Sequence, residues 1–522
     1  MVFSTILFLC VFLPIVIIGY YIVPAKAKNI FLLLASLFFY AWGEPGFIWI
    51  MLFSVVCNYG FGMLIWQLSK KQEANAEKGP YLQAWKKKAA VLAVILNLGI
   101  LFLFKYFTFC METIREAVNG EFSVVQIALP IGISFYTFQG LSYVIDVYRM
   151  EGKKDEKGEV CHIVQKNPLH LALYISMFPQ LIAGPIVRYT DIAASLTERK
   201  TTSAMFAAGA ERFIIGLAKK AILANMVGRM AADIFLADSS NMGMKVAWLG
   251  AIAYTLQIYF DFSGYSDMAI GLGNIFGFTF MENFRHPYIS TSIREFWRRW
   301  HISLSSWFRD YLYIPMGGSR KGNVYVHLLI VFVATGIWHG AGFGFLVWGL
   351  WHGIFIILER YLGSRMAGKA TGMQKDSLDK KNMEEAIGPS KGFFKRVHKG
   401  SIWLIKWLYT MLVVITGWVM FNLVSLKDGL SYLAIMFGIH KADFIAYDLR
   451  YYLSNQNICY FVIAVLGCLP FGAIVRHIPV LVQHKDSLFW LAGKRICLLA
   501  LLMLSFVFII NSSYNPFIYF RF

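Results

Sequence analysis

The sequence predicts an all-α polytopic membrane protein with about eleven or twelve membrane-embedded helices. Of its 522 residues, 58% are hydrophobic and only 15% are charged, whereas a soluble domain would be about half apolar and a quarter charged. The apolar residues come in long runs, and the basic residues gather in the short stretches between them. No segment is long and polar enough to form a separate soluble catalytic domain, so any chemistry belongs to the membrane helices.

Five apolar spans open the chain. The first, residues 3–23, is long enough to cross a bilayer core of roughly 30 Å as a helix. It lacks the basic start and the small-residue cleavage site of a signal peptide, so we expect a retained helix. The other four spans cover residues 30–43, 45–67, 89–109 and 124–147.

The loops between these spans alternate in charge. Residues 24–29, 68–88 and 149–168 are rich in lysine, whereas the turns at 43–45 and 110–122 are not. The positive-inside rule then places the N-terminus outside and the lysine loops in the cytoplasm. This rule and the attraction of anionic lipid headgroups account for the net charge of +19. No nucleic-acid-binding module is visible, so we expect membrane lipids and no nucleic acid as partners.

The middle of the chain is less regular. Apolar stretches at 171–186, 204–236 and 246–281 are interrupted by prolines and charges, and such segments must be buried in protein or line a cavity. A stretch dense in arginine and tryptophan, 285–324, precedes a short apolar run at 325–338 and a longer one at 343–362. A polar, lysine-rich loop is expected at 363–400, partly disordered and cytoplasmic. The last spans are 401–424, 457–475 and 496–512.

His339 is the first candidate catalytic residue. It stands in Gly-Ile-Trp-His-Gly-Ala-Gly, residues 336–342, between two apolar runs. An ionisable residue in such a place is a functional candidate, and histidine exchanges protons near neutral pH. A helix over 325–338 is only about 21 Å long, which places His339 inside the membrane slab. The alternative is a packing histidine at a helix turn. His352, which repeats Trp-His-Gly one helix later, is a weaker candidate.

A second group of candidates lies in residues 294–310. Phe296, Trp300 and Trp307 recur at about helical spacing, with Arg298 and Arg299 between them. Tryptophan and arginine suit a helix that lies at the lipid headgroup level, and this anchor role alone is one interpretation. In the other, the arginines also hold an anionic phosphate donor, such as a coenzyme or a lipid-linked carrier. His301, in the middle of the segment, would then join the site.

Two carboxylates, Asp261 and Asp267, interrupt the apolar run at 246–281. On a helix their spacing separates their directions by about 120°, so they are not an acid–base pair. We expect one of them to pair with an arginine of 285–299, either as a structural ion pair or as support for the site. The seven cysteines are scattered without a CxxC pair, so neither a metal site nor a disulfide framework is expected.

Several stretches together resemble the membrane-bound O-acyltransferase family, in its bacterial branch of alginate O-acetylation and D-alanyl transfer. The matching stretches are Phe135–Phe138, Pro179–Tyr189, Asp261–Gly271, Phe284–Tyr288, Phe296–Gly318, Gly336–Gly344 and the tail Tyr514–Phe522. They span most of the chain, and as a set they are specific.

This resemblance implies a ring of helices around a thin centre, with a tunnel that joins the two faces. We expect a single membrane domain, 1–522, with N-terminal helices at 1–148, the catalytic core at 149–362, the cytoplasmic loop at 363–400 and C-terminal helices at 401–522. His339 would be the catalytic base and His301 a second catalytic residue. Donor or substrate binding is assigned to the remaining candidates: Arg298, Arg299, Trp300, Trp338 and Asp267.

The function that follows is membrane O-acyl transfer, most simply of an acetyl group from cytoplasmic acetyl-CoA, with no bound cofactor or metal. The expected location is a bacterial plasma membrane. The acceptor would be a surface polysaccharide, reached through an extracytoplasmic acetyltransferase of the SGNH, serine-esterase-like type. D-alanyl transfer to teichoic acid from a carrier-protein thioester is the alternative within the enzyme class. Outside the enzyme class, the alternatives are a non-catalytic acyl transporter and a scaffold that recruits a surface glycan enzyme.

Overall fold

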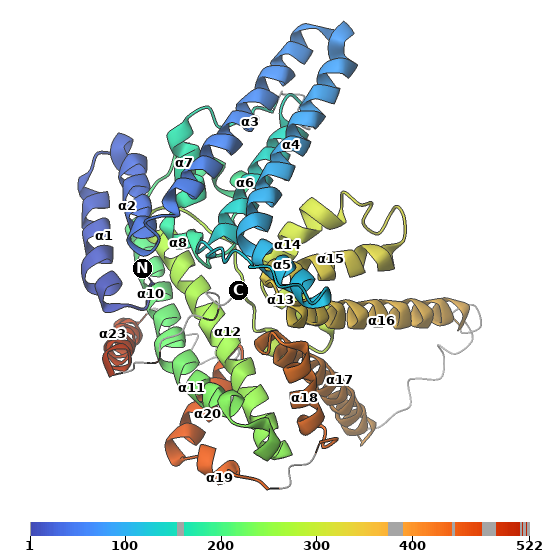
Figure 1. Cartoon of the computed structure of the whole chain (residues 1–522). Coiled ribbons are helices and arrows are strands. Elements are labelled where there is room, and N and C mark those ends of the chain that lie inside the picture. The colour runs from blue at the N-terminus through green and yellow to red at the C-terminus, as the bar shows by residue number, and fades with distance from the viewer. Residues whose placement is uncertain are drawn as a thin grey trace. The chain divides into compact units, whose positions relative to one another are not determined.

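A computed structural model describes residues 2–153, 161–373, 390–440, 444–471 and 487–511, together with Tyr514 and Ile518. The regular structure of these residues is helical, with no strand among them (Figure 1). The prediction of an all-α membrane protein is therefore confirmed. Among the described residues, five helices are long and apolar enough to cross a membrane: Ile48–Ala74, Gly79–Lys105, Phe343–Arg365, Gly400–Asn422 and Leu488–Asn511. The total of eleven or twelve embedded segments, the ring and the tunnel stay predictions.

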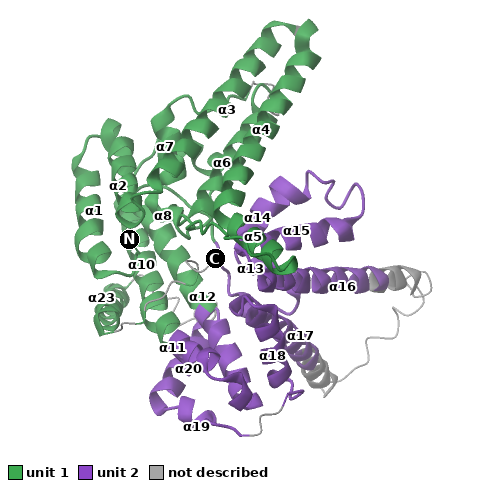
Figure 2. Cartoon of the chain, in the orientation of Figure 1, with its two compact units in different colours: residues 1–226, 258–282, 484–522 green, residues 227–257, 283–483 purple. Residues whose placement is uncertain are grey.

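The chain forms two compact units (Figure 2). Unit 1 consists of residues 1–226, 258–282 and 484–522, and unit 2 of residues 227–257 and 283–483. Helices α11 (Asn225–Leu236) and α12 (Met244–Ile275) contribute residues to both units.

The other helices of unit 1 come mainly from the N-terminal part of the chain. They are η1 (Phe8–Phe12), α1 (Leu13–Ile22), η2 (Ala25–Ala27), α2 (Lys28–Gly43), α3 (Ile48–Ala74), η3 (Ala76–Lys78), α4 (Gly79–Lys105), α5 (Phe107–Ala117), α6 (Ile133–Met150), α7 (Pro168–Ser176), α8 (Phe178–Leu181), α9 (Tyr189–Thr197), α10 (Ser203–Ala218), η4 (Lys219–Ala224) and α23 (Leu488–Asn511).

Aromatic packing and buried polar pairs hold unit 1 together. The ring of Phe3 stacks on Tyr265 at 4.4 Å and contacts Phe8 at 4.9 Å between centroids. Helices α3 and α4 lie side by side (Figure 1), and the amides of Asn58 and Asn97 bond each other across them, at 2.9 and 3.1 Å. Such interhelical hydrogen bonds join apolar helices that gain little from burial alone in a lipid environment.

Unit 2 contains the short helices of the arginine-rich segment and the hairpin that ends at His339. Its helices are η5 (Ser239–Asn241), η6 (Pro287–Ile289), α13 (Ile293–Arg299), α14 (Ile302–Phe308), η7 (Arg309–Tyr313), α15 (Val324–His339), α16 (Phe343–Met373), α17 (Ser390–Asn422), α18 (Leu426–Met436), α19 (Leu449–Tyr452) and α20 (Asn455–Gly467). Helices α15 and α16 pack against each other, and α16 also packs on α17 (Figure 1).

Three predicted elements differ from the structure. The span expected from residue 124 begins as a helix only at Ile133, because Gly132 precedes it with a left-handed φ of 78°. The helix expected through 294–310 is two short helices, α13 and α14, which meet at Trp300 and His301. Both ends of the range expected as a loop, 363–400, are helical, since α16 continues to Met373 and α17 begins at Ser390; residues 374–389 lie outside the described part.

Candidate active site

His339 ends α15 inside a cage of aromatic rings. Its side chain is buried, and its ring contacts Trp338, Trp348 and Phe421 at centroid distances of 4.9, 5.0 and 5.1 Å. Trp348 belongs to α16 and Phe421 to α17, so three helices enclose the imidazole. The helix stops here because Gly340 continues in extended backbone.

Glycines fix how closely α15 approaches α16. A methyl group at Gly336 would overlap the carbonyl oxygen of Phe345, and one at Gly349 would overlap the carbonyl oxygen of Phe332. The methyl position at Gly349 also lies 3.2 Å from the Cα of Gly336. Since no side chain fits between the backbones, the two helices hold His339 at a fixed place relative to α16.

His301 occupies the break between α13 and α14. It has a left-handed backbone, with φ 44°, and its side chain is buried. Its Nδ1 lies 3.0 Å from Oδ1 of Asn283, an oxygen that also accepts from the backbone N–H and the hydroxyl of Ser303, at 3.2 and 2.9 Å. Because the oxygen accepts, Nδ1 donates, and Nε2 keeps its lone pair. Burial lowers the pKa of His301 well below its usual range, so the ring is neutral.

Trp338 contacts both predicted histidines. Its ring centroid lies 6.1 Å from that of His301 and 4.9 Å from that of His339. The structure therefore brings these three sequence-predicted residues together within unit 2. Trp300 lies in the aromatic layer beside them, with its ring 5.6 Å from Phe296 and 4.8 Å from Trp418.

A pocket of about 320 Å³ opens in unit 2 beside the α15–α16 hairpin. Four guanidinium groups line it, those of Arg294, Arg298, Arg309 and Arg360. Its apolar wall includes Trp297 and Phe332, and Thr335 of α15 also reaches it. The pocket thus combines several positive charges with an apolar floor on the helix that ends in His339. We call it the arginine pocket.

The two neighbouring arginines predicted as donor-binding residues differ in their surroundings. Arg298 lines the arginine pocket and is exposed, and no carboxylate among the described residues forms an ion pair with it. Arg299 does not line the pocket; its Nη2 lies 2.8 Å from Oε1 of Glu295. Burial tends to raise the pKa of the Glu295 carboxyl, but hydrogen bonds from Thr291 and Arg299 hold that pKa below its usual range.

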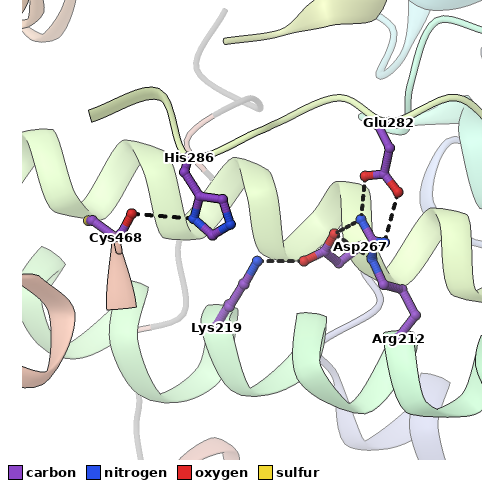
Figure 3. A network of polar contacts seen from close by, with 6 residues as sticks. All are labelled: Arg212, Lys219, Asp267, Glu282, His286 and Cys468. Carbon is purple, nitrogen blue, oxygen red and sulfur yellow. Dashed lines mark hydrogen bonds and ion pairs between the residues drawn. The ribbon is translucent and has the colours of Figure 1, made fainter. Parts of the chain in front are cut away.

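Asp267 belongs to an ionic cluster of unit 1 (Figure 3). Its carboxylate lies 2.7 Å from Nη2 of Arg212 and 2.6 Å from Nζ of Lys219, and Arg212 also holds Glu282 at 2.6 Å. The expectation of a partner among the arginines of 285–299 is therefore wrong, because α10 and η4 place other cations beside α12. The other six predicted site residues belong to unit 2.

Asp261 is also paired. Its Oδ1 lies 2.6 Å from Nζ of Lys220, and both side chains are almost completely buried. Its second oxygen accepts from the backbone N–H of Ile518 at 2.9 Å. Within the described ranges, no group of three His, Cys, Asp or Glu side chains is arranged to hold a metal ion.

Sequence reasoning missed several residues that surround the candidates. Asn283, which orients His301, lies 18 residues before it, and no spacing rule connects the two. Trp348 and Phe421 reach His339 from later helices and look like ordinary apolar residues in their spans. Arg294 and Arg360 could have been found, because Arg294 stands in the arginine-rich stretch 285–324 and Arg360 interrupts the apolar run at 343–362.

The chain is similar in sequence to several known proteins. The family model described as MBOAT, membrane-bound O-acyltransferase family, matches residues 35–377. The chain is 37% identical to the probable alginate O-acetylase AlgI of Pseudomonas putida, over 100% of both chains. It is 31% identical to the peptidoglycan O-acetyltransferase of Helicobacter pylori, over 100% of this chain and 98% of the relative. A teichoic acid D-alanyltransferase of Bacillus subtilis is 29% identical over 43% of this chain and 58% of the relative.

Proposed function

The chain belongs to the membrane-bound O-acyltransferase family, and from that premise we propose that it moves acetyl groups from acetyl-CoA to the outside of a bacterial plasma membrane. It is a multi-pass membrane enzyme that uses an acyl donor. The proposed acetyl groups serve O-acetylation of a cell-surface polysaccharide, the kind of acceptor that the alginate and peptidoglycan relatives are named for. We propose that residues 1–522 act as one membrane domain.

The arginine pocket is the observation that carries this proposal. A coenzyme A thioester combines several phosphate charges with a long, neutral arm. Exposed guanidinium groups at Arg294 and Arg298 suit the phosphates, and the wall formed by Trp297 and Phe332 suits the arm. The basic flanking segments, cytoplasmic by the positive-inside rule, suit entry of the donor from the cytoplasm.

His339 is proposed as the general base. Its imidazole would take the proton of the acceptor hydroxyl while the hydroxyl oxygen adds to the thioester carbonyl carbon. The C–S bond then breaks, the acetyl group stays on the oxygen, and the thiolate of coenzyme A takes up a proton. A buried imidazole between apolar helices has few other reasons to be kept.

The remaining candidates have supporting tasks in this proposal. His301 presents a lone pair on Nε2 next to Trp338 and is proposed to orient donor or acceptor. Arg298 binds phosphate directly. Arg299, which is paired with Glu295, makes no direct contact with the donor, and Trp300 supports the segment through its stack on Phe296. For Asp267, which belongs to unit 1, we propose a structural role through its ion pairs with Arg212 and Lys219.

The acceptor is proposed to be reached in two stages. An extracytoplasmic enzyme of the SGNH, serine-esterase-like type would take the acetyl group on its nucleophile and pass it to the polysaccharide. Its serine hydroxyl, or a sugar hydroxyl directly, is the group that His339 would deprotonate. Either acceptor supplies the same O–H chemistry.

Transfer of label from acetyl-CoA by the purified full chain, in lipid nanodiscs, tests the proposal. Wild type should pass acetyl label to a polysaccharide or to the serine enzyme, and His339→Ala should lower the rate by about 10²–10⁴-fold. His440→Ala is the matched control, because His440 is an exposed histidine of the same unit. Normal transfer by folded His339→Ala would exclude a general-base role.

A donor comparison separates the alternatives. A D-alanyl carrier-protein thioester replaces acetyl-CoA in the same assay. Preference for the D-alanyl donor would assign the chain to the activity named for the teichoic acid relative. Movement of label across the bilayer without formation of an ester would instead show a transporter.

A further inference from the structure

Unit 1 contains a polar pocket that has no part in the proposed acyl transfer. Helices α3, α4 and α6 lie side by side (Figure 1), and the end of α3, the first turns of α4 and the end of α6 enclose a cavity of about 450 Å³. These parts belong to the lysine-rich segments 68–88 and 149–168 or directly adjoin them. The positive-inside rule assigns both segments to the cytoplasmic side. We call this cavity the lysine pocket.

Lys86 of α4 brings an unpaired cation to the lysine pocket. The residue is only 5% exposed, and it forms no hydrogen bond or ion pair with any described residue. Its Nζ is nevertheless not enclosed by protein atoms, and Lys86 lines the pocket, so the charge faces that space. A cation that has left bulk water without a partner costs free energy. An anion in the pocket would relieve this cost.

The buried carboxylate of the pocket, that of Glu151, already has its partners. Its Oε2 accepts from the backbone N–H groups of Ile163 and Val164 at 2.8 and 3.0 Å, and its Oε1 lies 3.0 Å from Nδ1 of His162. Glu151 thus holds its own chain in place and does not lie within ion-pair distance of Lys86.

Glu73 is the second carboxylate of the pocket, and it has no such partners. It is exposed and forms no hydrogen bond or ion pair with any described residue. Its Oε1 would lie 2.9 Å from a methyl group on Gly152, so the carboxylate packs over the turn that follows α6. The lysine pocket therefore contains one unpaired charge of each sign, on Lys86 and on Glu73.

Two tryptophans indicate the depth of the lysine pocket in the membrane. The Nζ of Lys70 lies 4.7 Å from the ring centroid of Trp66, and that of Lys88 lies 4.7 Å from the ring centroid of Trp85. Tryptophan is typical of the lipid headgroup level, and lysine of the cytoplasmic ends of spans. Because Trp85 directly precedes Lys86, the pocket lies at the headgroups of the inner leaflet.

The chemistry of a phospholipid headgroup matches these charges. A phosphodiester is the common anion at this depth, and basic pockets between membrane helices bind headgroups on the cytoplasmic side. An aminoethyl headgroup carries an ammonium close to its phosphate, whereas a glycerol headgroup does not. Since Lys86 requires an anion and Glu73 a cation, a zwitterionic headgroup satisfies both.

We propose that the lysine pocket binds the phosphoethanolamine headgroup of a phospholipid from the inner leaflet. The phosphate lies against Lys86, with the exposed Lys153 at the rim, and the ammonium lies against Glu73. The bound lipid contacts α3, α4 and α6 together and joins their ends. This inference goes beyond the proposed acyl transfer, since it depends neither on the donor nor on His339.

Native mass spectrometry of the full chain in detergent tests the binding. The probes are phosphatidylethanolamine and phosphatidylglycerol with the same acyl chains, and wild type should bind phosphatidylethanolamine more tightly. Lys86→Met should weaken this binding by about 10–100-fold, because a charge-assisted hydrogen bond is lost. Lys87→Met is the matched control: it removes the same charge from the next residue, which is exposed and does not line the pocket, and should keep wild-type affinity.

Glu73→Gln tests the contact with the ammonium. This variant should bind the two lipids with equal affinity. Glu77→Gln, at an exposed residue outside the pocket, should keep the preference for phosphatidylethanolamine. Equal affinity of wild type for the two lipids, or wild-type affinity in Lys86→Met, would overturn the proposal.

Thermal unfolding distinguishes loss of the site from loss of the fold. Without phosphatidylethanolamine, Lys86→Met should unfold at the wild-type temperature or slightly above it, because methionine replaces a buried, unpaired charge. Added phosphatidylethanolamine should raise the unfolding temperature of wild type and of Lys87→Met, since a ligand stabilises the folded state that binds it. An equal rise in Lys86→Met would contradict the assignment to this pocket.

Soluble O-phosphoethanolamine and inorganic phosphate distinguish a lipid from a free phosphate ester. They offer the same charged groups without acyl chains. Each should raise the unfolding temperature of wild type much less than phosphatidylethanolamine does at the same concentration. A rise as large as that with the lipid would assign the pocket to a soluble ligand and overturn the lipid proposal.

Discussion

Arg299 holds Glu295 through two hydrogen bonds, from Nη2 at 2.8 Å and from Nε at 3.0 Å, both to the same carboxylate oxygen. The guanidinium next to it in sequence, on Arg298, instead faces the arginine pocket. Because consecutive residues of a helix point about 100° apart, two neighbouring arginines of α13 have different surroundings: one forms an internal ion pair, and the other is open to a ligand.

Arg298→Ala should weaken donor binding. Loss of one charge-assisted hydrogen bond to phosphate, worth about 1.5–3 kcal/mol, should raise KM for acetyl-CoA by about 10–100-fold and leave kcat nearly unchanged. Steady-state kinetics over a range of salt concentrations measure this, and the salt dependence of KM should become weaker in the variant.

Arg299→Ala is the control for that variant. Its ion pair with Glu295 is partly exposed and spans one helical turn, so its loss should cost only about 0.3–0.5 kcal/mol of stability. KM for acetyl-CoA should stay near the wild-type value. If KM rises equally in the two variants, the pocket does not distinguish them and a general electrostatic effect explains both.

Gly349→Ala should disturb the helix crossing that positions His339. The new methyl group would meet the backbone of α15 at Phe332 and Gly336, and backbone cannot move aside as a flexible side chain can. Overpacking of this kind costs typically 1–3 kcal/mol. Thermal unfolding should show the loss, together with a lower kcat.

Gly363 lies on the same helix as Gly349, and Gly363→Ala should stabilise the protein instead of destabilising it. No atom lies within 4 Å of the added methyl group, so only helix propensity changes, in favour of alanine by about 0.5–1 kcal/mol. This variant should unfold at slightly higher temperature with unchanged kcat. Equal destabilisation by both substitutions would show that the crossing at Gly349 has no special role.

Asn283→Asp should move the pH dependence of the reaction. Burial keeps the pKa of His301 low, so its neutral form persists below the usual range of histidine. A carboxylate 3.0 Å from Nδ1 would favour the imidazolium ion and raise that pKa. The acid limb of the pH–rate profile should therefore shift to higher pH, and Asn283→Ala, which adds no charge, should lower the rate without this shift.

Lys220→Met should destabilise unit 1. It would leave the carboxylate of Asp261 buried without its cation, and breaking one side of a buried pair costs about 3–5 kcal/mol. Adding Asp261→Leu to Lys220→Met should restore most of the stability, because the pair is then replaced by apolar groups. A double-mutant cycle in thermal unfolding measures the coupling, and additive effects would mean that the two charges do not interact.

The sequence was sufficient for the helical class, for the short helix before His339 and for the grouping of arginine with tryptophan. These depend on composition and local spacing. It was not sufficient for the break at His301, since the aromatic residues around it keep a helical period across the break. It also could not place Asn283, Trp348 or Phe421, because tertiary contacts between distant segments determine their neighbours. Asp267 shows the same limit: its charge indicated an ion pair, but only the packing of α10 on α12 identifies Arg212.

Helix α15 has 16 residues and is about 24 Å long at 1.5 Å per residue, several ångströms less than a typical hydrocarbon core of about 30 Å. Ile337, near its end, is 46% exposed and would face lipid. Hydrophobic mismatch of this kind is relieved by local thinning of the bilayer. The lipid surface would then dip next to His339, and the thickness of the membrane becomes part of the site: in a thin bilayer the imidazole lies nearer to water, and in a thick one it lies deeper in hydrocarbon.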